Sequence, residues 1–138
     1  MSLSSREILL VQDSINDILP IAQNTGEFFY DQLFSIAPHL RPLFQENIKP
    51  QARKIMTVMI HIIANLDNMA NISDELTQLA ERHLDYQVEP AHYDYIGQAL
   101  FKTIQNKIGD RWNVELATAW GKAYGNICDI MLKVHDKS

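Results

Sequence analysis

The sequence is short of the residues that build several common kinds of site. It contains one cysteine, Cys128, among 138 residues, so an internal disulfide and a zinc site built on paired thiolates are both excluded. Positive charge is also scarce, because 12 Lys and Arg stand against 17 Asp and Glu and the net charge is −5. A protein that binds nucleic acid through its phosphates needs a basic face, and we therefore expect no nucleic-acid partner.

Long hydrophobic runs and targeting signals are missing as well. The most apolar stretch, residues 55–66, is interrupted by Thr57, His61 and Asn65. It is shorter than the ~20 apolar residues that cross a bilayer. The N-terminal segment lacks the basic start and the apolar core of a signal peptide. We therefore predict no membrane span and a cytoplasmic location, which also suits a chain with a lone cysteine.

Strand signals are absent, and what remains is a series of helical patterns separated by proline. Neither a convincing period-two alternation nor a hairpin dipeptide such as Asn-Gly occurs. Apolar residues instead recur at spacings of three and four between the five prolines. We expect six or seven helices on one core in a single domain, residues 1–138, which is an all-α architecture. The expected helices cover residues 4–19, 20–36, 38–44, 50–66, 71–86, 90–108 and 113–134.

Three polar side chains fall on the apolar faces of three different expected helices. His83 continues the apolar stripe of LTQLAERHLDY, Tyr30 lies four residues after Gly26, and Gln51 lies four residues before Ile55. Taken singly, each is more often a core or helix-end side chain with its hydrogen bonds satisfied. The three together favour a pocket with a few polar groups in an apolar core, which is how ligand and cofactor sites are built.

A glycine in the second helical segment bears on the same pocket. Gly26 lies inside a helix, where glycine costs ~1 kcal/mol relative to alanine and often marks a close approach of two backbones. Ala52, at the start of the segment after Pro50, is the small residue that suits such an approach. If Gly26 meets Ala52, Tyr30 and Gln51 are brought side by side.

Six motifs, in this order along the chain, resemble those of the globin family. They are GEFFYDQLF, PHLRPLF, PQARK, ERH, AHYDYIGQAL and AWGKAYGNI, and they span essentially the whole sequence. Their order and separations resemble the bacterial single-domain haemoglobins and the globin part of the flavohaemoglobins most. The resemblance implies a globin fold, with six to eight helices around a pocket for haem b.

Carried over motif by motif, the resemblance implies roles for individual residues. His83 would be the protein ligand of the haem iron, and Phe44 would pack on the porphyrin. Tyr30 and Gln51 would form a distal polar pair that donates hydrogen bonds to dioxygen, each worth about 1.5–3 kcal/mol when the acceptor is charged. Apolar residues would form the wall around the haem: Ile55, Ile96, Leu100 and Met131.

The second shell of His83 departs from the flavohaemoglobin pattern. Tyr93 matches a tyrosine that supports the proximal histidine in that family, but His135 stands where the family has a glutamate. The nearest carboxylate, Asp136, would point about 100° around the helix. His135 could accept a hydrogen bond, although a carboxylate is the stronger acceptor. The alternative for His135 is a solvated side chain at a frayed C-terminus.

The resemblance implies reversible binding of dioxygen, nitric oxide and carbon monoxide at an iron that can be five-coordinate, because Gln51 replaces a distal histidine. We expect slow release of dioxygen and, as its use, conversion of nitric oxide and dioxygen to nitrate, with Tyr30 and Tyr93 as catalytic residues. This activity needs an external reductase, because we expect no fused one. An oxygen store or a sensor without turnover is the alternative. A haem-free interaction module is a third hypothesis, against which His83, Phe44 and the distal pair argue.

Overall fold

The computed structural model describes residues 3–85 and 91–137, with the side chains at positions 83–85 and 134–137 outside that description. Within those residues the chain forms α-helices joined by short 3-10 turns and contains no strand. The predicted all-α fold class is therefore confirmed. The elements are α1 (Ser5–Ile18), η1 (Leu19–Ile21), α2 (Ala22–Ile36), η2 (Pro38–Leu43), α3 (Lys49–Ala64), η3 (Leu66–Asn68), α4 (Met69–Asp85), α5 (His92–Ile108), η4 (Gly109–Arg111) and α6 (Val114–Lys137).

The helix ends follow the capping residues and prolines of the sequence. At the start of α1, Ser4 Oγ accepts a hydrogen bond from the Glu7 N–H at 3.1 Å, and the Glu7 carboxylate accepts one from the Ser4 N–H at 2.9 Å. This is the reciprocal capping box that the Ser-x-x-Glu spacing predicts. Pro20 lies in the 3-10 turn between α1 and α2, where its missing N–H breaks no helical bond. Farther along the chain, α5 stops at Gly109, whose φ of 66° is left-handed.

One expected boundary is wrong. Asn71 and Ser73 are candidate N-caps in the sequence, but α4 begins at Met69. The reason is that η3 leads directly into α4, and its turn is already closed by a 2.9 Å bond from the Asn68 N–H to the Asn65 carbonyl. Ser73 therefore lies inside the helix and not at its start.

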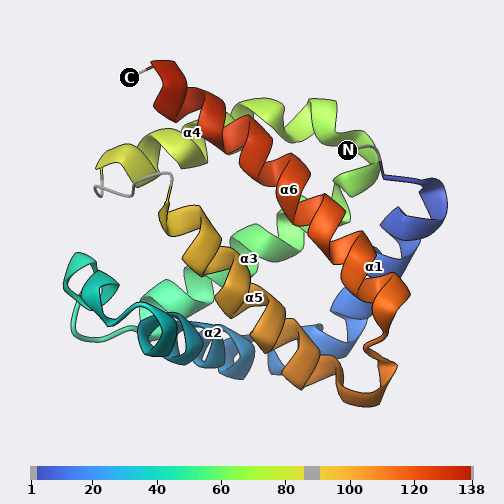
Figure 1. The fold of residues 1–138 in the computed structure, drawn as a ribbon, viewed down its shortest axis with the longest axis horizontal. Helices are drawn as coiled ribbons and strands as arrows, with labels where there is room; N and C mark the ends of the chain where they lie inside the picture. The colour runs from blue at the N-terminus through green and yellow to red at the C-terminus, as the bar shows by residue number, and fades with distance from the viewer. Residues whose placement is uncertain (1–2, 86–90, 138) are drawn as a thin grey trace.

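The helices form two groups that α6 joins. Figure 1 shows α2, α3 and α5 crossing in one half of the molecule, while α4 lies beside α6 in the other half. α3 and the segment Leu66–Arg82 form a pair that is bent by 60° at the break between them. Gln51 and His83 thus lie toward the far ends of two diverging arms. Within the described residues, no single helix is long and apolar enough to cross a membrane, and this bent pair reaches that length and hydropathy only together.

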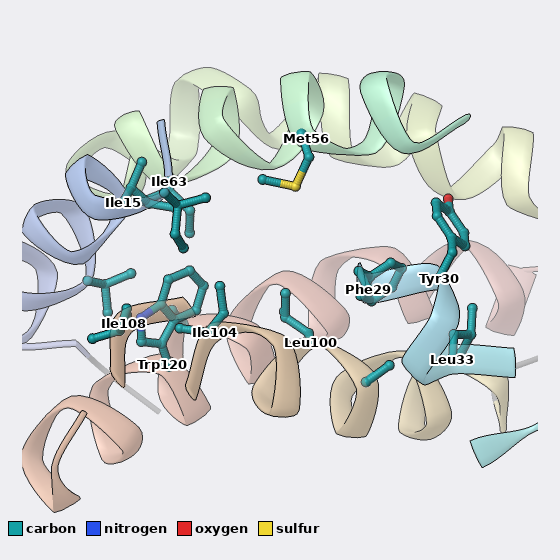
Figure 2. Close-up of a cluster of buried hydrophobic side chains, with 14 of the residues drawn as sticks. Ile15, Phe29, Tyr30, Leu33, Met56, Ile63, Leu100, Ile104, Ile108 and Trp120 are labelled. Atoms are coloured by element: carbon teal, nitrogen blue, oxygen red, sulfur yellow. The ribbon is translucent and has the colours of Figure 1, made fainter. Parts of the chain in front are cut away.

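The main core lies between α1, α2, α3, α5 and α6 (Figure 2). Phe29 and Trp120 are among its largest fully buried side chains. Trp120 Nε1 donates to Ser14 Oγ at 3.0 Å, so the polar atom of this buried ring is satisfied. Two smaller apolar clusters hold α4 in place: Ala80 with Tyr93, Cys128 and Met131, and Ile62 with Ile72 and Leu76.

The crossing of α2 and α3 depends on Gly26. A Cβ at this position would lie 2.6 Å from the Ala52 carbonyl oxygen and 2.9 Å from Met56 Cγ, distances that real Cβ atoms essentially never show. The predicted contact between Gly26 and Ala52 is confirmed. Because α2 packs over Ala52 and Met56, these residues are the most buried part of α3's first half. Ile55 and Met59, which periodicity places within the apolar face, are half-buried.

Candidate functional site

Tyr30 lies on the buried face of α2 and is the best-defined polar residue of the candidate site. Its side chain is 3% exposed and contacts three phenylalanine rings, with centroids 5.0 Å away for Phe29, 5.8 Å for Phe34 and 5.4 Å for Phe44. Figure 2 shows its hydroxyl pointing from α2 toward α3. These contacts leave the ring little freedom, so the position of the hydroxyl is set by packing.

The Tyr30 hydroxyl meets the side chain of Gln51, which is half-buried in the first turn of α3. Burial raises the pKa of Tyr30 to about 12, and the hydrogen bond with Gln51 acts in the opposite direction. Tyr30 therefore keeps its proton at neutral pH and can donate it in a hydrogen bond. The close approach at Gly26 is what brings these two helices, and hence the two polar side chains, together.

Phe44 directly follows η2 and is half-buried against the aromatic face of α2. Its ring lies 5.4 Å from those of Tyr30 and Phe34. Arg41 holds the irregular segment that follows, because its guanidinium donates to the carbonyls of Phe44 at 3.3 Å, Gln45 at 2.9 Å and Glu46 at 2.7 Å. The sequence-based analysis missed Arg41, since nothing in its spacing reveals three carbonyls folded around it.

His83 lies in the last turn of α4, and its side chain is outside the described residues. The preceding turns of the same face are described: Leu76 is 1% exposed and Ala80 is 0% exposed. Ala80 packs with Tyr93 of α5 and with Cys128 and Met131 of α6. The structure thus places the α4 turn before His83 against the start of α5 and against α6.

Tyr93, in the first turn of α5, is 6% exposed. Burial raises its pKa to about 12, with a smaller contribution from Cys128. Its backbone carbonyl accepts a 2.6 Å hydrogen bond from the Tyr124 hydroxyl. Tyr124 also lies over Gly97, where a Cβ would come within 2.7 Å of the tyrosine ring. Tyr124 therefore fixes the turn of α5 that carries Tyr93.

Tyr124 and Cys128 were not predicted as part of the site, although a signal was present in the sequence. They lie four residues apart on α6 and so share a face of that helix. Burial raises the pKa of the Cys128 thiol, so it stays protonated. His135, predicted near Tyr93, lies on the helical backbone of α6, which runs to Lys137, but its side chain is outside the described residues.

The residues predicted as apolar wall do not form a single group. Ile55 and Ile96 are half-buried at the edge of the main core, which is where a wall residue would lie. Leu100 is 6% exposed and packs within that core (Figure 2). Met131 is 5% exposed and belongs to the cluster around Tyr93.

A cavity of about 220 Å³ lies between α3 and α4, the two diverging arms. His61, an exposed residue of α3, forms a 2.6 Å contact from Nε2 to Glu75 Oε2 across these helices. Apolar side chains dominate the lining, which consists of Thr57, Val58, His61, Ile62, Ile72, Glu75, Leu76, Leu79 and Arg82. The His61–Glu75 contact therefore joins α3 and α4 beside this cavity.

The geometry agrees with the comparison to known sequences. The sequence profile of the family described as Globin matches residues 27–131. The chain belongs to the globin family. A flavohemoprotein of Bacillus subtilis is 30% identical over 127 residues, which are 87% of this chain and 32% of that protein. A flavohemoprotein of Rhizobium meliloti is 27% identical over 127 residues, which are again 87% of this chain and 32% of that protein. The chain thus spans about a third of the length of these relatives.

Solved globin structures share the fold at lower sequence identity. A bacterial globin from Campylobacter jejuni superposes with a TM-score of 0.83 at 23% identity, covering 96% of this chain and 99% of that one. An engineered carbene transferase from Rhodothermus marinus, described as a candidate nitric oxide dioxygenase, superposes with a TM-score of 0.86 at 21% identity, covering 98% and 95%. The predicted globin fold is confirmed.

Haem is the cofactor that follows from membership of this family, and the described residues fit it. Hydrogen-bond donors lie on the α2–α3 side, and apolar side chains line both diverging helices. The backbone of α4 carries a histidine at its far end, so one protein ligand is available for an iron whose other ligands are porphyrin nitrogens. Among the described residues, no group of three or more His, Cys, Asp or Glu could hold a metal ion.

Proposed function

We propose that this globin binds dioxygen at a haem iron ligated by His83 and holds it with hydrogen bonds from Tyr30 and Gln51. The observation that carries the proposal is the buried Tyr30 hydroxyl beside the Gln51 side chain, where α2 crosses α3 at Gly26. Ligand pockets are built in this way, with a few polar groups placed among apolar and aromatic side chains. Ile55, one turn after Gln51, would supply the apolar surface beside the ligand.

The haem supplies the iron that binds dioxygen, nitric oxide and carbon monoxide. The protein's contribution is to meet the negative charge that dioxygen gains on binding to ferrous iron. Tyr30 offers one O–H, kept protonated by its raised pKa of about 12, and Gln51 offers the N–H groups of its amide. A hydrogen bond to a charged acceptor stabilises by about 1.5–3 kcal/mol, which corresponds to roughly 10- to 150-fold slower release.

Slow release of dioxygen suits its consumption, and we propose dioxygen-dependent conversion of nitric oxide to nitrate as the reaction. The support comes from the flavohemoprotein relatives and from the Rhodothermus marinus structure described as a candidate nitric oxide dioxygenase. Electrons would come from a reductase outside the 138 residues. Tyr30 would then be a catalytic residue on the dioxygen side, and Tyr93 would act from the side of His83.

An oxygen store or a sensor without turnover is the second candidate, and one feature of the sequence favours it. His135 occupies the place where the flavohaemoglobin pattern has a glutamate, so the second shell of His83 would lack its strongest acceptor. Without electron donation from that side, the globin would hold dioxygen without helping it to react. Nitrate formed from the dioxygen complex on addition of nitric oxide, followed by repeated turnover with a reductase, would favour the enzyme.

The dioxygen dissociation rate of Tyr30→Phe tests the proposed distal pair. The substitution keeps the ring and its contacts with Phe29, Phe34 and Phe44, and removes only the hydroxyl. We expect dissociation to become roughly 10- to 150-fold faster, as the loss of one hydrogen bond to a charged acceptor predicts. Tyr95→Phe is the matched control, because Tyr95 packs on His39 and not on Tyr30. An unchanged rate in Tyr30→Phe would refute the assignment.

A further inference from the structure

Three aromatic rings beside the candidate site form a closed group. Tyr30 and Phe34 lie one turn apart on α2, and their rings stack with centroids 5.8 Å apart and planes inclined by 28°. Phe44, which follows η2, packs edge-on against both, with its centroid 5.4 Å from each and its plane inclined by 65° to each. In this aromatic triad every ring contacts the other two. A displacement of Phe34 or Phe44 therefore changes the packing around Tyr30.

Arg41 of η2 contacts both phenylalanines of the aromatic triad. Its guanidinium carbon Cζ lies over the Phe34 ring, 5.1 Å from the centroid, which is within the range of a cation–π interaction. The guanidinium also donates to the Phe44 carbonyl at 3.3 Å, while the Arg41 carbonyl accepts a 3.1 Å bond from the Phe44 N–H. Its bonds to the carbonyls of Gln45 and Glu46, at 2.9 and 2.7 Å, hold the residues that follow. One side chain thus holds Phe34 by its ring and Phe44 by its backbone.

This combination of contacts uses properties that arginine has and lysine lacks. A guanidinium is planar and carries five N–H donors in a fixed fork, so it can lie against an aromatic face while it donates to several carbonyls. A lysine ammonium is a compact charge with three donors on a flexible stem. It could lie over Phe34, but it would not hold three carbonyls in one arrangement. Arg41 is half-buried, so water competes less for these contacts than it would at an exposed position.

We propose that Arg41 is a positioning residue of the dioxygen site, which fixes the aromatic triad and thereby the place of the Tyr30 hydroxyl. The hydroxyl is rigidly attached to its ring, so it moves when the packing of the ring changes. A hydrogen bond weakens steeply as its length and angle depart from the favoured values, so a small movement is sufficient to weaken it. The guanidinium itself is directed to backbone carbonyls, and Arg41 therefore acts on the ligand through Tyr30. This role rests on the proposed function, in which Tyr30 donates to dioxygen.

Arg41→Met tests the role, because it keeps a long apolar stem but removes the charge and the fork of donors. In the haem-loaded ferrous variant we expect dioxygen to dissociate about three- to tenfold faster, less than in Tyr30→Phe, because a misaligned hydrogen bond is weakened and not abolished. With carbon monoxide as the ligand, the C–O stretching band in the infrared spectrum should move to higher frequency, since a donor near the ligand lowers it. Arg41→Lys should lie between the parent and Arg41→Met in both measurements, and it carries the test if Arg41→Met does not fold.

A double-mutant cycle with Tyr30→Phe separates action through the hydroxyl from action by another route. Without the hydroxyl, Arg41→Met is expected to leave the dissociation rate and the C–O band where Tyr30→Phe alone places them. The same change in both backgrounds would overturn the proposal, as would an Arg41→Met variant with the rate and band of the parent. An unchanged rate in Tyr30→Phe itself would refute the dioxygen site, and the role of Arg41 with it.

Arg111→Met is the matched control for loss of an arginine that makes three hydrogen bonds. The Arg111 guanidinium donates to the two Asp17 carboxylate oxygens at 2.7 and 2.6 Å and to Asp13 at 3.4 Å, but these bonds join η4 to α1. We expect this variant to unfold at lower urea concentration and to keep the dissociation rate and C–O band of the parent. Shifts as large as those in Arg41→Met would mean that lost stability alone alters the site, and they would overturn the assignment.

Discussion

The two tyrosines that we propose for the haem pocket, Tyr30 and Tyr93, are both buried and have the same raised pKa of about 12, but they are held in different ways. Tyr30 is fixed through its ring and hydroxyl, by phenylalanine rings and the Gln51 side chain. For Tyr93 the fixed group is its backbone carbonyl, which accepts a 2.6 Å bond from Tyr124. The packing around Tyr30 directs its hydroxyl toward α3, whereas the Tyr124 hydroxyl joins α6 to α5. We therefore expect substitutions on the α2–α3 side to change ligand binding, and substitutions at Tyr124 to change stability.

Gly26→Val is expected to have the largest effect on stability, because its side chain would clash with α3 where α2 crosses that helix. Even the Cβ would lie 2.6 Å from the Ala52 carbonyl oxygen, which is backbone and cannot move aside cheaply. Overpacking of this kind costs about 1–3 kcal/mol and occasionally more, and we expect a loss of about 3 kcal/mol in the free energy of unfolding. Urea denaturation measures it. Gly125→Ala is the control, since a Cβ there meets nothing within 4 Å, and it should stabilise by up to ~1 kcal/mol.

Alkaline pH should weaken the fold through both tyrosines. Their pKa is about 12 in the folded protein and near the ordinary value of 10 in the unfolded chain. The unfolded chain loses these protons first, so the free energy of unfolding is unaffected below pH 10 and falls as the pH rises from about 10 to about 12. The slope reaches at most about 1.4 kcal/mol per pH unit for each group.

Denaturant midpoints measured across this pH range test the argument. Tyr30→Phe and Tyr93→Phe should each make the decline shallower, and the double variant should make it shallower still. Tyr95→Phe is the control for removal of a phenol elsewhere. If the decline is as steep in the double variant as in the parent, then the two buried phenols are not its cause.

Tyr124→Phe should have a smaller effect, confined to stability. It keeps the ring over Gly97 but removes the hydroxyl that donates to the Tyr93 carbonyl. The loss of one neutral hydrogen bond predicts a decrease of about 1 kcal/mol in the free energy of unfolding. We expect the dioxygen dissociation rate to change far less than in Tyr30→Phe. If Tyr124→Phe changed the dioxygen dissociation rate more than Tyr30→Phe does, the proposed difference between the surroundings of Tyr30 and those of Tyr93 would be wrong.

Glu75→Gln should have the smallest effect. The side chains of His61 and Glu75 are 51% and 57% exposed, and exposed ion pairs contribute about 0–1 kcal/mol. We expect the free energy of unfolding, measured by thermal denaturation, to change by less than about 0.5 kcal/mol. The change should become smaller as salt is added. His61→Gln should give the same change as Glu75→Gln, and the double variant should give no more than either. A large loss of stability would mean that the His61–Glu75 contact contributes more to holding α3 and α4 together than their apolar packing does.

Much of the fold could be predicted because the information is local. The Ser4–Glu7 capping box, the stop at Gly109 and the repeats of apolar residues act within one or two helical turns. The contact of Gly26 with Ala52 could also be anticipated, since a glycine inside a helix costs stability and is tolerated where another backbone comes close. These signals were sufficient to establish the helices and the close approach of α2 and α3 on which the proposed distal pair depends.

The features that could not be predicted depend on how helices cross. The bond from Tyr124 to the Tyr93 carbonyl requires the angle between α5 and α6, and the deeper burial of Ala52 than of Ile55 requires the position of α2 on α3. Periodicity identifies a face to within about one residue in either direction, and only the packed partner decides which residue is central. The start of α4 was missed for a similar reason, because η3 had already turned the chain into a helix.

The segment after η2 has no regular structure, but the Arg41 guanidinium donates hydrogen bonds to three of its carbonyls. Arg41 is also the sole lysine or arginine between Pro38 and Ile48, and it is followed by Pro42. Trypsin cleaves poorly before proline, so the segment that positions Phe44 offers this protease no good site. A tryptic digest of the native protein should therefore leave the corner intact while other surface loops are cut. Arg41 thus holds the segment after η2 in place, and because Pro42 follows it, trypsin does not cleave there efficiently.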